Sequence, residues 1–143
     1  MKTPSGSMER VPGTGVPIRI LHLEDDPVDA RLIGEQLRKS SLDVAITVAG
    51  SREAFEALVP RGDFDLVLSD YHVPRFNGLE ALELVRGASP QIPFILVTGA
   101  LGDERAVELL RAGATDFVLK DRLARLAPAI QRALADREVR KRH

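Results

Sequence analysis

The sequence predicts an α/β fold in three layers: a doubly wound, five-stranded parallel sheet with five helices on its two faces. Two observations carry this prediction. Short apolar segments alternate with amphipathic segments five times along the chain, which is the pattern of such a sheet. The third apolar segment, 64–69, is apolar nearly throughout, as expected for a parallel strand covered on both faces. Right-handed crossovers then leave few topologies open.

The strand candidates are short apolar runs, and several of them end at polar side chains. They lie at 18–23, 44–48, 64–69, 93–97 and 114–119. In open parallel sheets the ligand site lies beyond the carboxyl ends of the strands. The residues that follow these strands are therefore the candidate site.

The helix candidates are recognised by apolar side chains at helical spacing. Asp26 is predicted to cap the first helix, with Pro27 in its first turn, and Asp121 is predicted to cap the last. The expected helices cover 27–37, 54–58, 79–85, 103–112 and 123–134.

The length of 143 residues suits one domain with a single core. Residues 1–17 are rich in Gly, Pro, Ser and Thr, and we expect them to form a disordered tail. We expect the folded domain at 18–134 and a helix extension or linker at 135–143, where the sequence becomes mostly polar.

The composition excludes several classes of function. A net charge of −1, 4% aromatic residues and no Trp argue against nucleic-acid binding. Without cysteine, disulfides, thiolate catalysis and zinc–cysteine sites are excluded. No apolar run approaches a membrane span and no signal peptide is recognised, so we expect a cytoplasmic protein without a membrane partner.

The predicted strand ends carry a set of polar residues that suits phosphoryl transfer. In chain order they are Glu24, Asp25, Asp26, Asp70, Thr98 and Lys120. Several carboxylates in one crevice repel each other unless they gain protons or share a cation. Mg²⁺ (or Mn²⁺) fits, because it prefers oxygen ligands and accepts a phosphoryl oxygen. A lysine and a threonine could hold the other phosphoryl oxygens, and an aspartate could be the nucleophile.

Four segments together resemble the receiver domain of two-component response regulators. LHLEDDP resembles the family's acidic turn, DLVLSDYHVPRFNG its phosphoacceptor segment, and FILVTGA and DFVLKD the segments that carry its switch hydroxyl and its phosphate-binding lysine. The resemblance runs from about residue 18 to about residue 134. It implies a flavodoxin-like fold with strand order 2-1-3-4-5.

The resemblance assigns a role to each matching residue. Asp70 is implied as the phosphoacceptor, with Pro74 and Gly78 shaping the loop that follows. The implied metal ligands are Glu24, Asp25, Asp70 and the backbone carbonyl of His72. The implied phosphoryl-binding and switch residues are Thr98, Lys120 and Phe117, and the implied lifetime-tuning residues are His72 and Ala100.

The resemblance also implies partners. The phosphoryl group would come from a sensor histidine kinase or a histidine phosphotransfer protein, and an output partner would bind the switched surface. A homodimer could form through the fourth helix, fifth strand and fifth helix, or through the C-terminal helix. Asp121 replaces the proline that most receivers have after the lysine, so a cis bond is not expected there. LKDRLARL is similar to a subgroup often linked to sensor kinases.

Other readings of these residues stay open. A Mg²⁺-dependent phosphohydrolase with an aspartyl nucleophile would need a general acid, for which His72 is the candidate. An FMN binder would need a phosphate loop where this chain has three acids, and a binding module without chemistry would not need the full set of acids, Thr and Lys. His22 and Phe117 are also compatible with ordinary core packing. The resemblance implies self-catalysed phosphoryl acceptance and autodephosphorylation, not turnover of external substrates.

Overall fold

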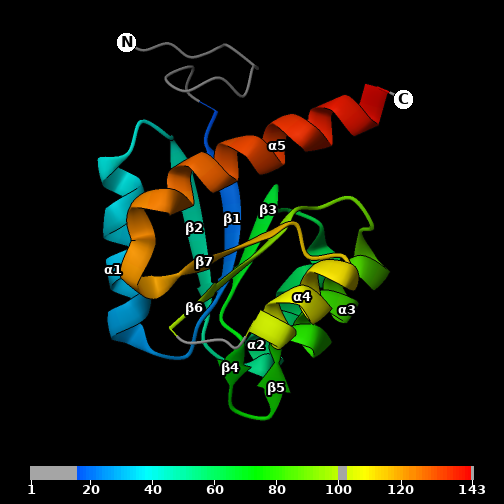
Figure 1. Ribbon diagram of the computed structural model, residues 1–143. Coiled ribbons are helices and arrows are strands. Elements are labelled where there is room, and N and C mark those ends of the chain that lie inside the picture. Colours follow the sequence, from blue (N-terminus) through cyan, green and yellow to red (C-terminus); the bar gives the residue numbers. More distant parts are fainter. Residues whose placement is uncertain (1–15, 100–102, 143) are drawn as a thin grey trace.

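The fold is a five-stranded parallel sheet between two layers of helices, as described by a computed structural model of residues 16–99 and 103–142 (Figure 1). The sheet has the order β2-β1-β3-β6-β7, which confirms the predicted 2-1-3-4-5 topology. Its strands are β1 (Ile18–Leu23), β2 (Val44–Ala49), β3 (Leu66–Ser69), β6 (Phe94–Thr98) and β7 (Asp116–Leu119).

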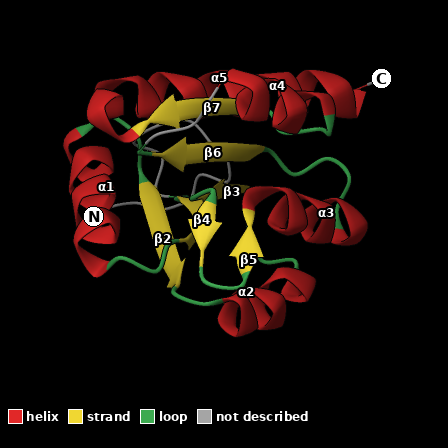
Figure 2. Cartoon of the chain, turned by 60° about the horizontal axis from the view of Figure 1, so that its bottom comes forward, coloured by secondary structure: helices red, strands yellow, loops and turns green. Residues whose placement is uncertain are grey.

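The helices alternate with the strands and cover both faces of the sheet (Figure 2). They are α1 (Pro27–Lys39), α2 (Arg52–Leu58), α3 (Gly78–Ala88), α4 (Asp103–Arg111) and α5 (Leu126–Arg142), with 3₁₀ turns η1 (Val59–Arg61) and η2 (Lys120–Arg125). Asp26 caps α1 as predicted, since its side chain accepts the Val28 N–H at 2.9 Å. None of the described helices is long and apolar enough to cross a membrane.

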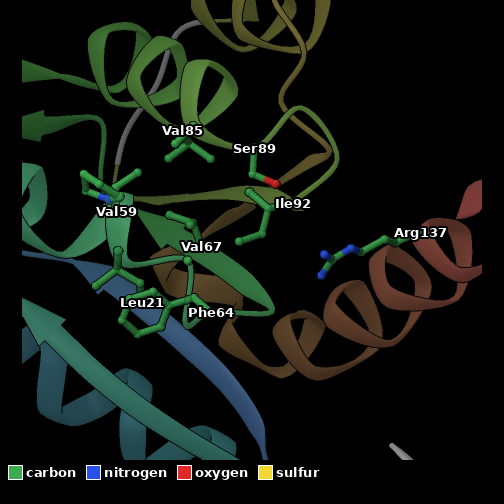
Figure 3. Close-up of a pocket in the computed structure, with 11 residues that line it drawn as sticks. Leu21, Val59, Phe64, Val67, Val85, Ser89, Ile92 and Arg137 are labelled. Carbon is green, nitrogen blue, oxygen red and sulfur yellow. The ribbon is translucent and has the colours of Figure 1, made fainter.

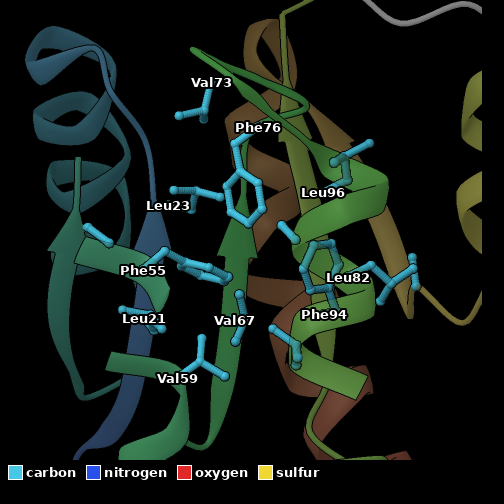
Figure 4. Close-up of a cluster of buried hydrophobic side chains, with 14 of the residues drawn as sticks. Leu21, Leu23, Phe55, Val59, Val67, Val73, Phe76, Leu82, Phe94 and Leu96 are labelled. Carbon is cyan, nitrogen blue, oxygen red and sulfur yellow. The ribbon is translucent and has the colours of Figure 1, made fainter. Parts of the chain in front are cut away.

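Two apolar cores hold the layers together, because successive side chains of a strand point to opposite faces. On one face Leu21 and Leu23 pack with Phe55, Leu82 and other residues of α2, α3 and α4 (Figure 4). On the other face, side chains of β1 pack with those of α1 and α5. This second core includes Ile18, Ile20, Ile33, Leu37, Leu126 and Ile130.

A small antiparallel hairpin after β3 was not expected from the sequence. It consists of β4 (His72–Val73) and β5 (Phe76–Asn77), joined by the two-residue turn Pro74–Arg75. Arg75 has a φ of 63°, which Pro74 and the tight turn impose. Arg52 holds the hairpin against α2: its guanidinium lies 4.9 Å from the centre of the Phe76 ring and donates to the Arg75 carbonyl at 3.1 Å.

Gly78 then starts α3 where the backbone approaches the ring of Tyr71. A Cβ atom at Gly78 would lie 2.8 Å from Tyr71 Cδ1. Only glycine therefore fits at this point, which fixes the path of the chain as it returns from the hairpin.

The last helix differs from the prediction at its start. Its α-helical part begins at Leu126, so the prediction of Asp121 as its cap was wrong. The chain after Lys120 forms the 3₁₀ turn η2 instead, and Arg122 interrupts it with φ −131° and ψ 45°. The described part of the chain contains no cis peptide bond, so the Lys120–Asp121 bond is trans.

The distal half of α5 is attached to the end of the sheet where β3 begins. Arg137 donates to the Asp65 carbonyl at 3.0 Å. Its guanidinium points toward a cavity of about 110 Å³ that is lined mostly by apolar side chains, among them Phe64, Val85 and Ile92 (Figure 3). This contact attaches α5 to the rest of the domain at a point that follows the buried apolar residues of the helix.

Candidate functional site

The candidate site forms where four neighbouring strands end. The parallel register pairs Leu23 of β1 with Ser69 of β3, and Thr98 of β6 with Leu119 of β7. The residues that end or follow these strands therefore lie at one edge of the sheet. Those that the structure places there are Glu24 and Asp25 after β1, Asp70 after β3, Thr98 at the end of β6 and Lys120 after β7.

Lys120 lies at the centre of the site. Its ammonium nitrogen Nζ is 2.8 Å from Glu24 Oε1, 3.1 Å from Asp70 Oδ2 and 2.7 Å from Asp29 Oδ2. Burial lowers the pKa of Lys120, but the contacts with Asp29, Glu24 and Asp70 outweigh this effect and hold the pKa above its ordinary value. Lys120 is therefore a permanent cation between carboxylates from three elements.

Three carboxylates form a compact acidic cluster. Glu24, Asp25 and Asp70 each place one oxygen within 4.8 Å of the others. Backbone amides hold two of these acids in place: Glu24 Oε2 accepts the Asp26 N–H at 3.2 Å, and Asp70 Oδ1 accepts the Tyr71 N–H at 2.7 Å. Such an oxygen-only donor set suits a hard divalent cation.

Glu24 is the most deeply buried acid of this cluster. Its side chain has no exposed surface. Burial raises the pKa of Glu24 from 4.5 to about 6, although the contact with Lys120 opposes the shift. Burial therefore destabilises the charged form of Glu24 relative to the protonated form. This is the electrostatic condition under which a bound cation stabilises a site.

The remaining predicted residues lie in different environments. Thr98 is buried at the end of β6, with 1% of its surface exposed. Phe117 on β7 is 37% exposed, so the alternative that it is an ordinary core residue was wrong. His72 is exposed in the hairpin, with its ring edge-on to Tyr71. Ala100 lies outside the described residues.

Asp29 is the residue of the site that the sequence did not indicate. It lies in the first turn of α1, where an acidic side chain is already favoured by the positive end of the helix. Its contact with Lys120 joins residues 91 positions apart. Only the assembled fold shows this contact.

His22 lies one strand position before Leu23 and is fully buried, as predicted for a core residue. Neither ring nitrogen has a hydrogen-bond partner in the described structure. Burial, and secondarily the charge of Lys120, lowers the pKa of His22 to about 4. The ring is therefore neutral at physiological pH.

This burial predicts an acid-sensitive fold. The folded state binds its proton more weakly than the unfolded state, whose His22 has a pKa of 6.5. Above pH 6.5 His22 is neutral in both states, so this shift in its pKa does not change the unfolding free energy. As the pH falls to about 4, protonation of the unfolded state lowers the unfolding free energy by up to roughly 3 kcal/mol. We expect His22→Leu to remove this loss in urea unfolding measured at several pH values, while His72→Gln, a change at an exposed histidine, leaves it in place. Equal pH profiles for His22→Leu and the wild type would contradict this account.

Comparison with known proteins agrees with this geometry. Residues 20–131 match the family model of the response regulator receiver domain. The chain belongs to this family. The match spans β1 to the first part of α5 and so includes every strand end of the candidate site.

Two curated relatives show how this receiver domain compares in sequence. It is 34% identical over 119 residues to the transcriptional regulatory protein ZraR of Salmonella typhimurium, which covers 82% of this chain and 26% of that protein. It is 33% identical over 136 residues to the two-component response regulator ORR1 of Oryza sativa subsp. indica, covering 82% of this chain and 58% of the relative. The chain thus spans about a quarter to three fifths of the length of these relatives.

Solved structures agree on the fold. The CheY-like receiver domain protein of Methanospirillum hungatei superimposes with a TM-score of 0.78 at 26% identity, covering 87% of this chain and 99% of the other. The receiver domain of a signal transduction histidine kinase from Syntrophus aciditrophicus gives a TM-score of 0.70 at 25% identity, covering 82% and 90%. The receiver domain described here therefore shares its fold with both of these solved receiver domains.

Proposed function

We propose that this receiver domain accepts a phosphoryl group on Asp70 from a phosphohistidine of a sensor histidine kinase or a histidine phosphotransfer protein. The observation that carries the proposal is the position of Asp70. The residue lies directly after β3 and is 8% exposed, with Lys120 Nζ 3.1 Å from its Oδ2 and the acidic cluster beside it. Catalysis of phosphoryl transfer depends mainly on positioning the reacting groups and on stabilising the charge of the transferring phosphoryl group.

Glu24, Asp25 and Asp70 would hold a divalent cation, Mg²⁺ or Mn²⁺, together with the backbone carbonyl of His72 that the family resemblance implies. Once bound, the cation would offset the carboxylate charge and stabilise the negative charge on the transferring phosphoryl group. The oxygen ligands suit this ion, and its positive charge would stabilise the charged form of Glu24, which burial disfavours.

The remaining chemistry belongs to the protein's own side chains. The Tyr71 N–H orients Asp70 through Oδ1. Asp70 attacks the phosphorus, so that a P–O bond forms while the P–N bond to the donor's histidine breaks. Lys120 and Thr98 then hold phosphoryl oxygens. Hydrolysis of the aspartyl phosphate returns the domain to rest, at a rate that we assign to the positions of His72 and Ala100.

The phosphorylated domain is proposed to switch a surface formed by α4, β7 and α5. Movement of Thr98 toward the phosphoryl group would alter this surface, and Phe117 would change its exposure. This surface already presents apolar side chains to solvent: Val107 is 44% exposed, Leu110 40% and Phe117 37%. Exposed apolar groups of this kind suit an output partner or a second copy of the chain.

The donor is proposed to dock beside α1. Val28 and Leu32, one helical turn apart on this helix, are 49% and 46% exposed. They lie on the element that follows the acidic turn and supplies Asp29 to the site.

We propose that the receiver domain covers residues 18–134 and that the rest of α5 is a connector helix or linker. We also assign the domain to the cytoplasm, where its phosphodonors act.

Incubation with acetyl phosphate tests the proposed function. With Mg²⁺ we expect one phosphoryl group per chain, located on Asp70 by peptide mass spectrometry and labile to hydroxylamine; with EDTA we expect none. A label on another residue, or labelling that does not need a divalent cation, would contradict the proposal. Many turnovers of p-nitrophenyl phosphate per chain would favour a phosphohydrolase instead.

A further inference from the structure

We propose that Asp29 is a positioning residue that keeps the Lys120 ammonium beside Asp70 when a divalent cation occupies the acidic cluster, an inference that rests on the proposed function. Asp29 Oδ2 accepts a hydrogen bond from Lys120 Nζ at 2.7 Å. The contact joins the start of α1 to the end of β7 across the site.

The three carboxylate partners of Lys120 are not equivalent. Glu24 and Asp70 belong to the acidic cluster, whereas Asp29 does not belong to it among the described residues. A cation in the cluster would draw on the oxygens of Glu24 and Asp70 and would repel the nearby ammonium. Asp29 is then the carboxylate that still attracts Lys120 without being shared.

The backbone that carries Asp29 is well fixed. Asp26 caps the helix one turn earlier, and Ile33 and Leu37 anchor it in the core. Lysine, in contrast, has a flexible four-carbon side chain and a single point charge. With 17% of its side chain exposed, Lys120 has room to turn toward solvent if its anchor is lost. A fixed carboxylate on α1 prevents this movement.

Beryllofluoride mimics a phosphoryl group on the acceptor aspartate. Its binding in the presence of Mg²⁺ measures the proposed role, because Lys120 is proposed to hold that group beside Asp70. We expect Asp29→Asn to weaken beryllofluoride binding by about tenfold, in line with the loss of one charge-assisted hydrogen bond, while Mg²⁺ affinity alone changes little. Asp29→Glu should recover part of the affinity. The matched control is Glu35→Gln, which removes the same charge from an exposed position of α1 and should leave binding unchanged.

A double-mutant cycle in the metal-free protein separates this role from a general effect on helix stability. Asp29→Asn should lower the urea midpoint more in the wild type than in a Lys120→Gln background, where only the interaction of Asp29 with the helix dipole remains. Equal effects in both backgrounds would overturn the inference, since Asp29 would then act on α1 and not through Lys120.

The outcomes also separate this inference from the proposed function. If the wild type binds beryllofluoride and Asp29→Asn behaves like Glu35→Gln, the positioning role is wrong and the proposed function stands. If the wild type binds no beryllofluoride with Mg²⁺ present, the proposed function fails and the inference fails with it.

Discussion

Replacing Asp70 with Asn is expected to abolish phosphoryl transfer to the protein while leaving the fold intact. A neutral amide is not a nucleophile toward phosphorus, so the covalent step is lost entirely. The side-chain carbonyl of Asn can still accept the Tyr71 N–H, which Asp70 Oδ1 accepts at 2.7 Å. Removing the Asp70 charge also relieves its repulsion of Glu24. Mass spectrometry after incubation with acetyl phosphate and Mg²⁺ measures the outcome.

Asp43→Asn is the matched control for this experiment. Asp43 is exposed just before β2, at the end of the sheet opposite the site. It should accept no label and its replacement should not change labelling of Asp70. Undiminished Mg²⁺-dependent labelling of Asp70→Asn would show that another residue is the acceptor. A second variant, Asp70→Ala, would confirm that loss of labelling does not depend on the amide.

Replacing Glu24 with Gln is expected to stabilise the metal-free protein and to remove its stabilisation by Mg²⁺. The pKa of Glu24 in the folded state is raised from 4.5 to about 6, so the folded state holds this proton more tightly than the unfolded state. The unfolding free energy therefore falls as the pH rises through this window, and the full cost, about 2 kcal/mol, is present above pH 6. Gln resembles the protonated side chain and avoids this cost.

Urea unfolding at pH 8 in EDTA and then in Mg²⁺ checks this prediction. In EDTA, Glu24→Gln should be more stable than the wild type by about 2 kcal/mol, and this gain should disappear as the pH falls below 4.5. Added Mg²⁺ should stabilise the wild type but not the variant, because the variant has lost a charged ligand. Glu35→Gln should behave as the wild type throughout. A variant that is still stabilised by Mg²⁺ would show that Glu24 is not a ligand.

The sequence predicted the parts of this structure that depend on local patterns. Apolar runs located the strands, and the polar residues after 18–23 and 64–69 identified Glu24 and Asp70 as candidates, because parallel strands end at one edge of a sheet. The cap at Asp26 was also confirmed, since it depends on one side chain and the next turn. Boundaries shifted by about two residues where strands begin, as at Leu66 and Asp116.

The features that the sequence could not predict depend on contacts between distant residues. The pairing of Asp29 with Lys120 is one example, since an acid in a first helical turn has a local explanation. The hairpin after Asp70 is another: it is held by Arg52, which lies on a different element. The late start of α5 reflects the 3₁₀ turn after Lys120, whose geometry no residue pattern revealed.

The attachment of α5 has a mechanical consequence. The helix begins shortly after Lys120, and its 17 residues form a rod of about 25 Å that reaches past the opposite end of the sheet. Arg137, bound to the Asp65 carbonyl, attaches this rod to the domain a second time, beyond its core contacts. Because the first half of α5 is packed in the core and Arg137 binds the Asp65 carbonyl further along, we expect the helix to follow the body of the domain as one rigid element.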